Sequence, residues 1–279
     1  MSREEARAAL DAVGQLPEVE IDIATAALQL ARIDAPEADW RAGAETLTAI
    51  ARAAVRAAAA DPVADGGDLA RRRAALAGVL QGEFGFEGDT ETYEDMANAN
   101  LLRVIERRRG LPVSLGILWL HAAEAAGWAA HGVDFPGHFL LALTGRGQVV
   151  VDVFTGGEQM EARALRSLLK KFVGEQAELG PDTLAPMGNR AVLLRLQNNI
   201  KVRRLRDGDL PGAVACTEDM LRIAPDAAPL WREAGLMHQR LDHIAAAIQC
   251  LERFLMLAPE GVQALRVRGL LEELRQRLN

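Results

Sequence analysis

The feature that most constrains the fold is a change of hydrophobic period near residue 128. Before it, apolar residues recur at helical spacing, as in "DWRAGAETLTAIARAAVRAAA" and "SLGILWLHAAEAAG". After it come three short β-favouring segments, "HGVDF", "HFLLALTG" and "QVVVDVF". Since the helices precede the strands without regular alternation, the sequence predicts an α+β fold with a helical N-terminal region and a small antiparallel sheet.

Local signals set the expected helix boundaries. Breaks are expected at Pro17, at Pro36 and in "DPVADGGD", where Asp68 can cap the next helix. Gly110 is expected just past the end of the helix in "NANLLRVIERRRG", and Pro112 in the first turn of the helix that follows. One arginine of "ERRRG" is expected to make a buried ion pair, with Glu106 or Asp152 as its partner.

The C-terminal part contains an internal repeat with an offset of 34 residues. The matching pairs are Arg206/Arg240, Ala213/Ala247, Cys216/Cys250, Glu218/Glu252, Leu221/Leu255, Ala224/Ala258 and Pro225/Pro259. This period is typical of a tetratricopeptide helical hairpin, with "GVQALRVRGLLEELRQRLN" as a last helix. The sequence therefore predicts two domains, an α+β domain over residues 1–187 and all-α helical repeats over residues 188–279. The two cysteines are expected to be small buried core residues of these repeats.

Composition and charge exclude several classes of function. The net charge of −7 argues against nucleic acid as the main partner. No apolar run approaches the ~20 residues of a membrane span, and "MSREEARAAL" lacks the apolar core of a signal peptide. Two cysteines are too few for a disulfide framework, so a reducing, cytoplasmic compartment is expected. The motifs CxxC, HExxH and GxxxxGK[ST] are missing, so no cofactor and no metal are predicted.

His138 and Asp152 are the candidate catalytic pair. With a three-residue turn at Thr144–Arg146, His138 stands opposite Asp152 across a hairpin, at a Cβ separation of ~5 Å. A carboxylate that orients an imidazole is the base half of a catalytic triad. The alternative is a structural His–Asp bond, and a slip of one residue would place the two on opposite faces.

A metal site in "HGVDFPGH" is a weaker hypothesis. His131, Asp134 and His138 lie within eight residues, but the two histidines differ by an odd number and would point to opposite faces of a strand. Zinc sites need three or four convergent ligands. We therefore expect no metal here.

Several blocks of this sequence resemble a known family. They are Asn98-x2-Leu101-x2-Val104, "ERRRGLPVSL", "GVDFPGHFLL", "VDVFTGG" and "NNIKVRRL". They resemble the bacterial invasion-regulator-like branch of the transglutaminase-like, papain-related superfamily, in which tetratricopeptide-type repeats follow the core. The resemblance covers most of the chain, from about residue 20 to the end.

The resemblance implies an altered active site. In active relatives the nucleophilic Cys is third in "G-x-C" at a helix start, and the corresponding triplet here is Gly110-Leu111-Pro112. His138 and Asp152 match the family's His and Asp. Ser114 is the remaining hydroxyl nearby, but two residues along a helix is a rotation of about 200° away from the Pro112 position. Asn98, a motif residue, and Pro112 are the candidate substrate-binding residues, although Asn98 is also expected to hold the loop before its helix.

Three functions remain open at this stage. The first is a catalytically inactive or altered transglutaminase-like protein whose C-terminal repeats bind a protein or peptide partner. The second is a hydrolase or amide-transfer enzyme that uses Ser114, or an activated water, with His138 and Asp152. The third is a purely architectural protein. The sequence names neither the partner nor the oligomeric state.

Overall fold

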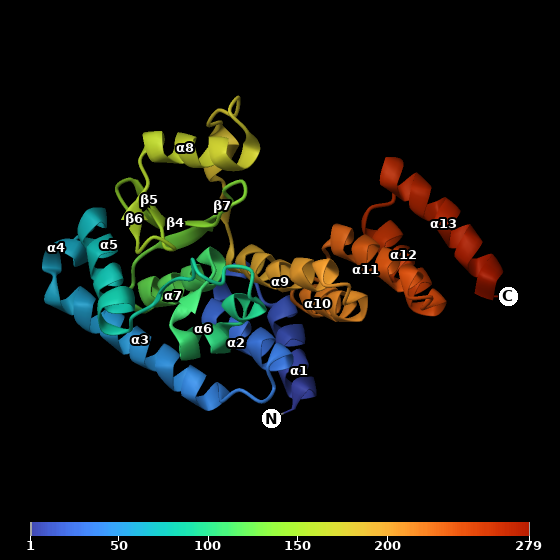
Figure 1. Cartoon of the computed structure of the whole chain (residues 1–279), viewed down its shortest axis with the longest axis horizontal. Coiled ribbons are helices and arrows are strands. Elements are labelled where there is room, and N and C mark those ends of the chain that lie inside the picture. Colours follow the sequence, from blue (N-terminus) through green and yellow to red (C-terminus); the bar gives the residue numbers. More distant parts are fainter. Residues whose placement is uncertain (1, 279) are drawn as a thin grey trace. The chain divides into compact units, whose positions relative to one another are not determined.

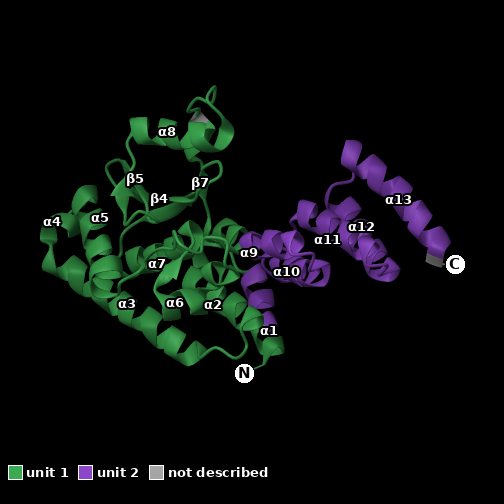
Figure 2. Cartoon of the chain, viewed as in Figure 1, with its two compact units in different colours: residues 1–6, 16–196 green, residues 7–15, 197–279 purple. Residues whose placement is uncertain are grey.

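The computed structural model describes residues 2–278 and separates into two compact units (Figure 2). Unit 1 comprises Met1–Ala6 and Leu16–Leu196, and unit 2 comprises Arg7–Gln15 and Gln197–Asn279. The division falls inside helix α9 (Asn189–Arg206) rather than before it. It also assigns most of the N-terminal helix α1 (Arg3–Gln15) to the unit that contains the repeats.

Helices make up most of unit 1. They are α2 (Ile23–Asp34), α3 (Trp40–Ala60), α4 (Pro62–Asp65), α5 (Leu69–Ala77), a π-helical turn (Gly78–Glu83), 3-10 turns (Glu18–Glu20, Met96–Ala99 and Pro181–Leu184), α6 (Leu101–Arg107), α7 (Pro112–Ala125) and α8 (Ala162–Val173). The predicted cap at Asp68 is confirmed, because its side chain accepts a hydrogen bond from the Arg71 amide. Within residues 2–278, no helix has the length and apolar character needed to cross a membrane.

The predicted end of α6 at Gly110 was wrong. The helix ends at Arg107, and its C-cap residue Arg108 is a non-glycine residue in the left-handed region with φ of 61°. Gly110 instead belongs to the short strand β2 (Arg109–Gly110), which pairs in parallel with β1 (Glu87–Gly88). A Cβ on Gly110 would lie 3.0 Å from both methyl groups of Val104, so packing against α6 favours glycine there. Pro112 does occupy the first turn of α7, as predicted.

The main sheet of unit 1 has five antiparallel strands in the order β6-β5-β4-β3-β7. The strands are β3 (Ala130–Val133), β4 (Leu140–Thr144), β5 (Gln148–Asp152), β6 (Glu158–Gln159) and β7 (Pro186–Met187). In Figure 1 the sheet lies between α8 and α7. Leu140 and Ala142 pack with Leu165 and Leu169 of α8. On the other side α7 contacts β3 and β4, which explains why β4 is buried on both faces.

The predicted hairpin register was wrong by two residues. Ala142 pairs with Val150 and Leu141 with Val151, because the turn lies at Gly145–Gly147. Asp152 therefore stands opposite the position of Leu140, and His138 lies diagonally before it. A slip of two keeps each side chain on its predicted face, since the strand period is two.

Unit 2 is all helical. It contains α10 (Leu210–Ile223), α11 (Ala228–Arg240), α12 (Ile244–Leu257) and α13 (Val262–Leu278), with part of α9 and residues 7–15 of α1. The N-terminal helix joins this unit through ion pairs. Arg7 lies 2.9 Å from Asp219 of α10, and Asp11 lies 2.7 Å from Arg222. Cys216 and Cys250 are buried and form no disulfide with each other, and their burial agrees with the prediction from the repeat pattern.

Candidate functional site

The imidazole of His138 and the carboxylate of Asp152 are in contact. His138 Nε2 lies 3.1 Å from each Asp152 carboxylate oxygen, and the side chains are 10% and 8% exposed. The Phe154 amide also donates to Asp152 Oδ1 at 3.0 Å. The predicted pair is therefore formed, with the carboxylate itself held by backbone.

This contact determines which imidazole nitrogen remains available. A neutral imidazole that donates from Nε2 to Asp152 carries its lone pair on Nδ1. Among residues 2–278, no hydrogen-bond partner of His138 Nδ1 is found. The arrangement thus presents a proton acceptor at Nδ1, oriented by a carboxylate.

Aromatic side chains surround the imidazole. The Phe172 ring of α8 stacks on His138, with centroids 6.0 Å apart and planes 21° apart. Phe154 meets His138 edge-on at 6.4 Å, and Tyr93 meets Phe154 edge-on at 5.8 Å. Gly137, with φ of +72°, lets Phe172 approach, because a Cβ there would lie 2.5 Å from the ring. Sequence reasoning missed these three aromatic residues.

Arg195 of α9 fixes the segment before His138. Its guanidinium donates to the backbone carbonyl of His138 at 2.7 Å and pairs with the Asp134 carboxylate. Burial lowers the pKa of Arg195, and the Asp134 charge opposes that effect. Asp134 is thus engaged by a cation. In the part of the chain that the structure describes, no group of three His, Cys, Asp or Glu side chains is arranged to hold a metal.

Two glycines, Gly110 and Gly88, link the residues just before α7 to the aromatic side chains around His138. Gly110 pairs with Gly88, and a Cβ on Gly88 would lie 2.5 Å from the Phe154 carbonyl oxygen. Phe154 in turn packs against His138. Pro112 is buried, its side chain offers no polar atom, and no side chain caps α7 at Leu111. That Pro112 faces His138 across this cluster remains a prediction.

The structure gives Ser114 a partner other than His138. Ser114 is fully buried, and its Oγ donates to the backbone carbonyl of Asn98 at 2.7 Å. This bond ties α7 to the 3-10 turn before α6. The structure therefore brings His138 and Asp152 together and does not bring Ser114 to them.

Asn98 joins three segments. Its side-chain amide donates to the Thr92 carbonyl at 2.6 Å, its Oδ1 accepts from Arg107 at 3.1 Å, and its backbone carbonyl also accepts from the Leu111 amide at 3.0 Å. The residue is fully buried. These bonds are those of a residue that holds the loop at Thr92, helix α6 and the start of α7 together.

Asp89 is the buried acid that sequence reasoning missed. It is 1% exposed and accepts hydrogen bonds from the Thr92 amide at 2.8 Å, the Thr92 hydroxyl at 2.6 Å and Arg107 at 2.9 Å. Burial alone would raise the pKa of Asp89, but hydrogen bonds from the hydroxyl and amide of Thr92, from Asn98 and from the Glu91 amide hold it well below its ordinary value. Arg107 thus makes the expected ion pair, with Asp89 as its partner rather than Glu106 or Asp152. The signal that was overlooked is the D-x-x-T pattern of a capped turn.

Comparisons with known proteins support both parts of the chain. The family model of the transglutaminase-like superfamily matches residues 42–198, and a tetratricopeptide-repeat model matches residues 200–272. No solved structure matches the chain.

Curated relatives are bacterial. The chain is 34% identical over 161 residues to a UPF0162 protein of Vibrio cholerae and 31% identical over 179 residues to one of Xylella fastidiosa. It is 25% identical over 173 residues to Protein SirB1 of Salmonella typhimurium. These matches cover 57%, 62% and 61% of this chain and 59%, 63% and 64% of the relatives, so the chain spans less than two thirds of their length. Since the transglutaminase-like match extends over more than half of its residues, the chain belongs to the transglutaminase-like superfamily and carries tetratricopeptide repeats behind that domain.

Proposed function

We propose that this protein is a transglutaminase-like protein without the family's covalent chemistry, and that its helical repeats bind a protein partner. One observation carries the first half. A side chain without a nucleophile, Pro112, begins the helix where the family places its thiol, and the nearby Ser114 hydroxyl is bonded to Asn98. Acyl transfer through a covalent intermediate needs a thiol or hydroxyl beside the base.

A second candidate function is favoured by His138 Nδ1, for which the described part of the chain supplies no hydrogen-bond partner. A base oriented by Asp152 can activate a water molecule, so hydrolysis without a covalent intermediate is the competing proposal. The two functions differ in whether activity depends on His138.

The chemical half is tested with the intact chain. It is incubated with an amine donor and a glutamine-containing protein, and separately with fluorogenic peptide amides, each beside the His138→Ala variant. We expect no product above the background of the uncatalysed reaction for either protein. Turnover that His138→Ala reduces by 100-fold or more, the scale expected for loss of a general base, would establish the water-activating enzyme instead.

The binding half is tested by photo-crosslinking in cells. A photoreactive residue replaces Leu205 or Val262 of unit 2, or Val55 or Val63 of unit 1, all of which are exposed. We expect protein adducts from the unit 2 positions and few from unit 1. Adducts confined to unit 1 would show that the transglutaminase-like domain, and not the repeats, contacts the partner.

A further inference from the structure

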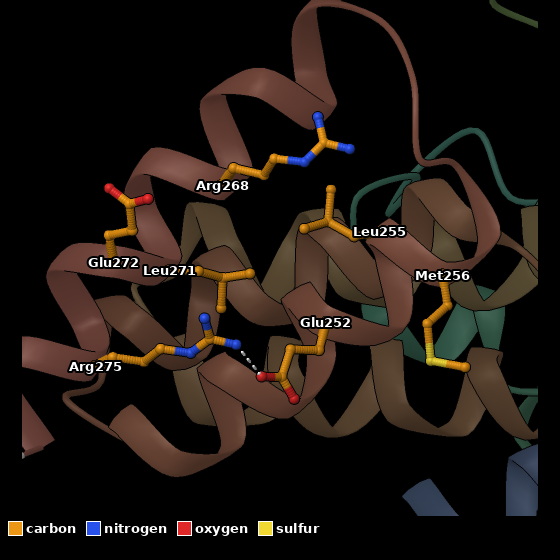
Figure 3. A pocket seen from close by; sticks show the side chains of 7 residues that line it. All are labelled: Glu252, Leu255, Met256, Arg268, Leu271, Glu272 and Arg275. Atoms are coloured by element: carbon orange, nitrogen blue, oxygen red, sulfur yellow. Dashed lines mark hydrogen bonds and ion pairs between the residues drawn. The ribbon is translucent and has the colours of Figure 1, made fainter.

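A groove runs between α12 and α13 in unit 2 (Figure 3). Its volume is about 590 Å³, and it is lined by Glu252, Leu255, Met256, Arg268, Leu271, Glu272 and Arg275. Four of these lie on α13 at positions i, i+3, i+4 and i+7, so they form one stripe along that helix. Leu255 and the buried Leu271 lie between the polar groups of Arg268 and Glu252, and Met256 adds exposed apolar surface (Figure 3).

Two exposed apolar side chains lie in or beside this groove. Met256, which lines it, is 73% exposed, and Leu265 of α13 is 66% exposed. Leu265 precedes Arg268 by three residues, so it lies on the same face of α13. A cluster of large exposed apolar side chains beside a groove is typical of a binding surface.

Some of the charged side chains that line the groove form ion pairs, and others do not. Arg275 bonds to Glu252 at 2.6 Å, and this pair is drawn in Figure 3. Arg268 donates to the Pro259 carbonyl at 2.6 Å, and within residues 2–278 no carboxylate lies within ion-pair distance of it. Glu272, one turn further along α13, likewise makes no ion pair among the described residues. A guanidinium with free donors beside apolar surface is suited to a carboxylate.

We propose that this groove binds an amphipathic helix of a protein partner. The partner's apolar side chains contact Leu255, Met256 and Leu265, and an acidic side chain on the same helix pairs with Arg268. A helix is the occupant that matches a groove between two helices whose contacts recur every three to four residues. The inference rests on the proposed function, because it locates the partner-binding surface within the repeats.

The test uses a library of displayed 16-residue helix-forming peptides, selected on the intact chain. We expect enriched sequences to combine apolar residues at helical spacing with Asp or Glu. Binding of a selected peptide, measured by fluorescence anisotropy, is expected to weaken by 10-fold or more in Arg268→Glu and in Met256→Lys. A peptide with Lys in place of its acidic residue is expected to regain binding to Arg268→Glu.

Arg266→Glu is the matched control, because Arg266 is exposed on the same helix but lies two residues from Arg268 and so faces elsewhere. We expect it to change binding less than 2-fold. Equal losses in both variants, no enriched peptide, or enriched peptides indifferent to Arg268→Glu would overturn the groove as the site. A dimer of the free chain that Met256→Lys dissociates would identify a second copy as occupant and also overturn the proposal. Unit 2 adducts in the photo-crosslinking experiment would still support the proposed function in any of these cases.

Discussion

The polar side chains of the His138 site in unit 1 and of the α12–α13 groove in unit 2 differ in burial and in the number of hydrogen bonds that they make. In unit 1, Asp152 and Asp89 are nearly buried, and each accepts several hydrogen bonds. In unit 2, Arg268 and Arg275 stand at the surface, and each makes one polar contact within residues 2–278. Buried polar groups must be satisfied internally, whereas exposed ones keep capacity for a partner. The carboxylates of the site that resembles an active site are thus satisfied internally, whereas the two arginines of the repeats keep donors for a partner.

The largest effect on stability is expected from substituting Asp89, which tests whether the buried polar network of unit 1 is stabilising. Asp89→Ala leaves the partly buried Arg107 and the Thr92 amide without their acceptor, and we expect the free energy of unfolding to fall by about 3 kcal/mol. Urea denaturation of the intact chain measures the loss, and hydrogen exchange of the α6 amides places it in unit 1. A loss below about 1 kcal/mol would mean that this network is no more important than a surface pair.

The pH dependence of the same network gives a second test. Because the pKa of Asp89 is lower in the folded chain, its contribution is fully present above the unfolded pKa of about 3.9 and is lost as pH falls toward the folded value. We expect the stability difference between the parent chain and Asp89→Asn to be constant from pH 5 to 7. It should shrink below about pH 4 in urea titrations. A difference that persists unchanged to pH 2 would contradict the assignment.

A glycine-to-alanine substitution in each unit compares the close packing around Gly116 in unit 1 with the open surface around Gly269 in unit 2. A Cβ on Gly116 would lie 2.1 Å from the Phe139 ring, so Gly116→Ala is expected to destabilise by about 1–3 kcal/mol. A Cβ on Gly269 of α13 meets nothing within 4 Å, so Gly269→Ala is expected to stabilise by about 0.5–1 kcal/mol through helix propensity. Thermal denaturation compares the two. A neutral Gly116→Ala would contradict the close packing of α7 against the sheet.

Restoring a thiol tests the geometry around His138. In Pro112→Cys, the new thiol begins α7, where helix N–H groups and His138 favour the thiolate. Burial, with a further contribution from Glu218, raises the pKa of Cys250 to about 11, and Cys216 is buried, so the natural thiols contribute little labelling. Pro112 is buried too, but this restricts access of the reagent equally in Pro112→Cys and in the double variant, so the ratio of their rates is compared. We expect iodoacetamide at pH 6.5 to label Pro112→Cys about 10-fold faster than the double variant that also carries His138→Ala. Equal rates would mean that His138 does not reach the start of α7.

The smallest effect is expected at the groove's own ion pair. Glu252 and Arg275 are both about half exposed, so Glu252→Ala should change the free energy of unfolding by less than about 1 kcal/mol. The same variant frees Arg275, and binding of an acidic selected peptide should not weaken. Stability by urea denaturation and affinity by anisotropy check the two halves. A loss of several kcal/mol would contradict this, because it would mean that the pair stabilises the fold as much as the buried networks of unit 1.

Much of the fold could be predicted because its signals are local. The Asp68 cap, the proline at the start of α7 and the three central strands follow from residues close together in the chain. The hairpin register could not be fixed in this way. The chain turns at Gly145–Gly147, and Thr144 remains in the strand because its amide also bonds to the carbonyl of Ala129, the residue before β3. Contact between His138 and Asp152 survived this error only because the slip was even.

The sequence by itself determined that no thiol begins α7, that a histidine and an aspartate share one face of a hairpin, and that the helical repeats have a period of 34 residues. Only the tertiary structure decided the partners of the buried polar groups. Asp89 meets Arg107, Ser114 meets Asn98, and residues 7–15 join the repeats through Asp219 and Arg222. Such contacts join residues that are far apart in the chain. Which donor each acceptor meets is settled when packing excludes water and leaves one group within reach.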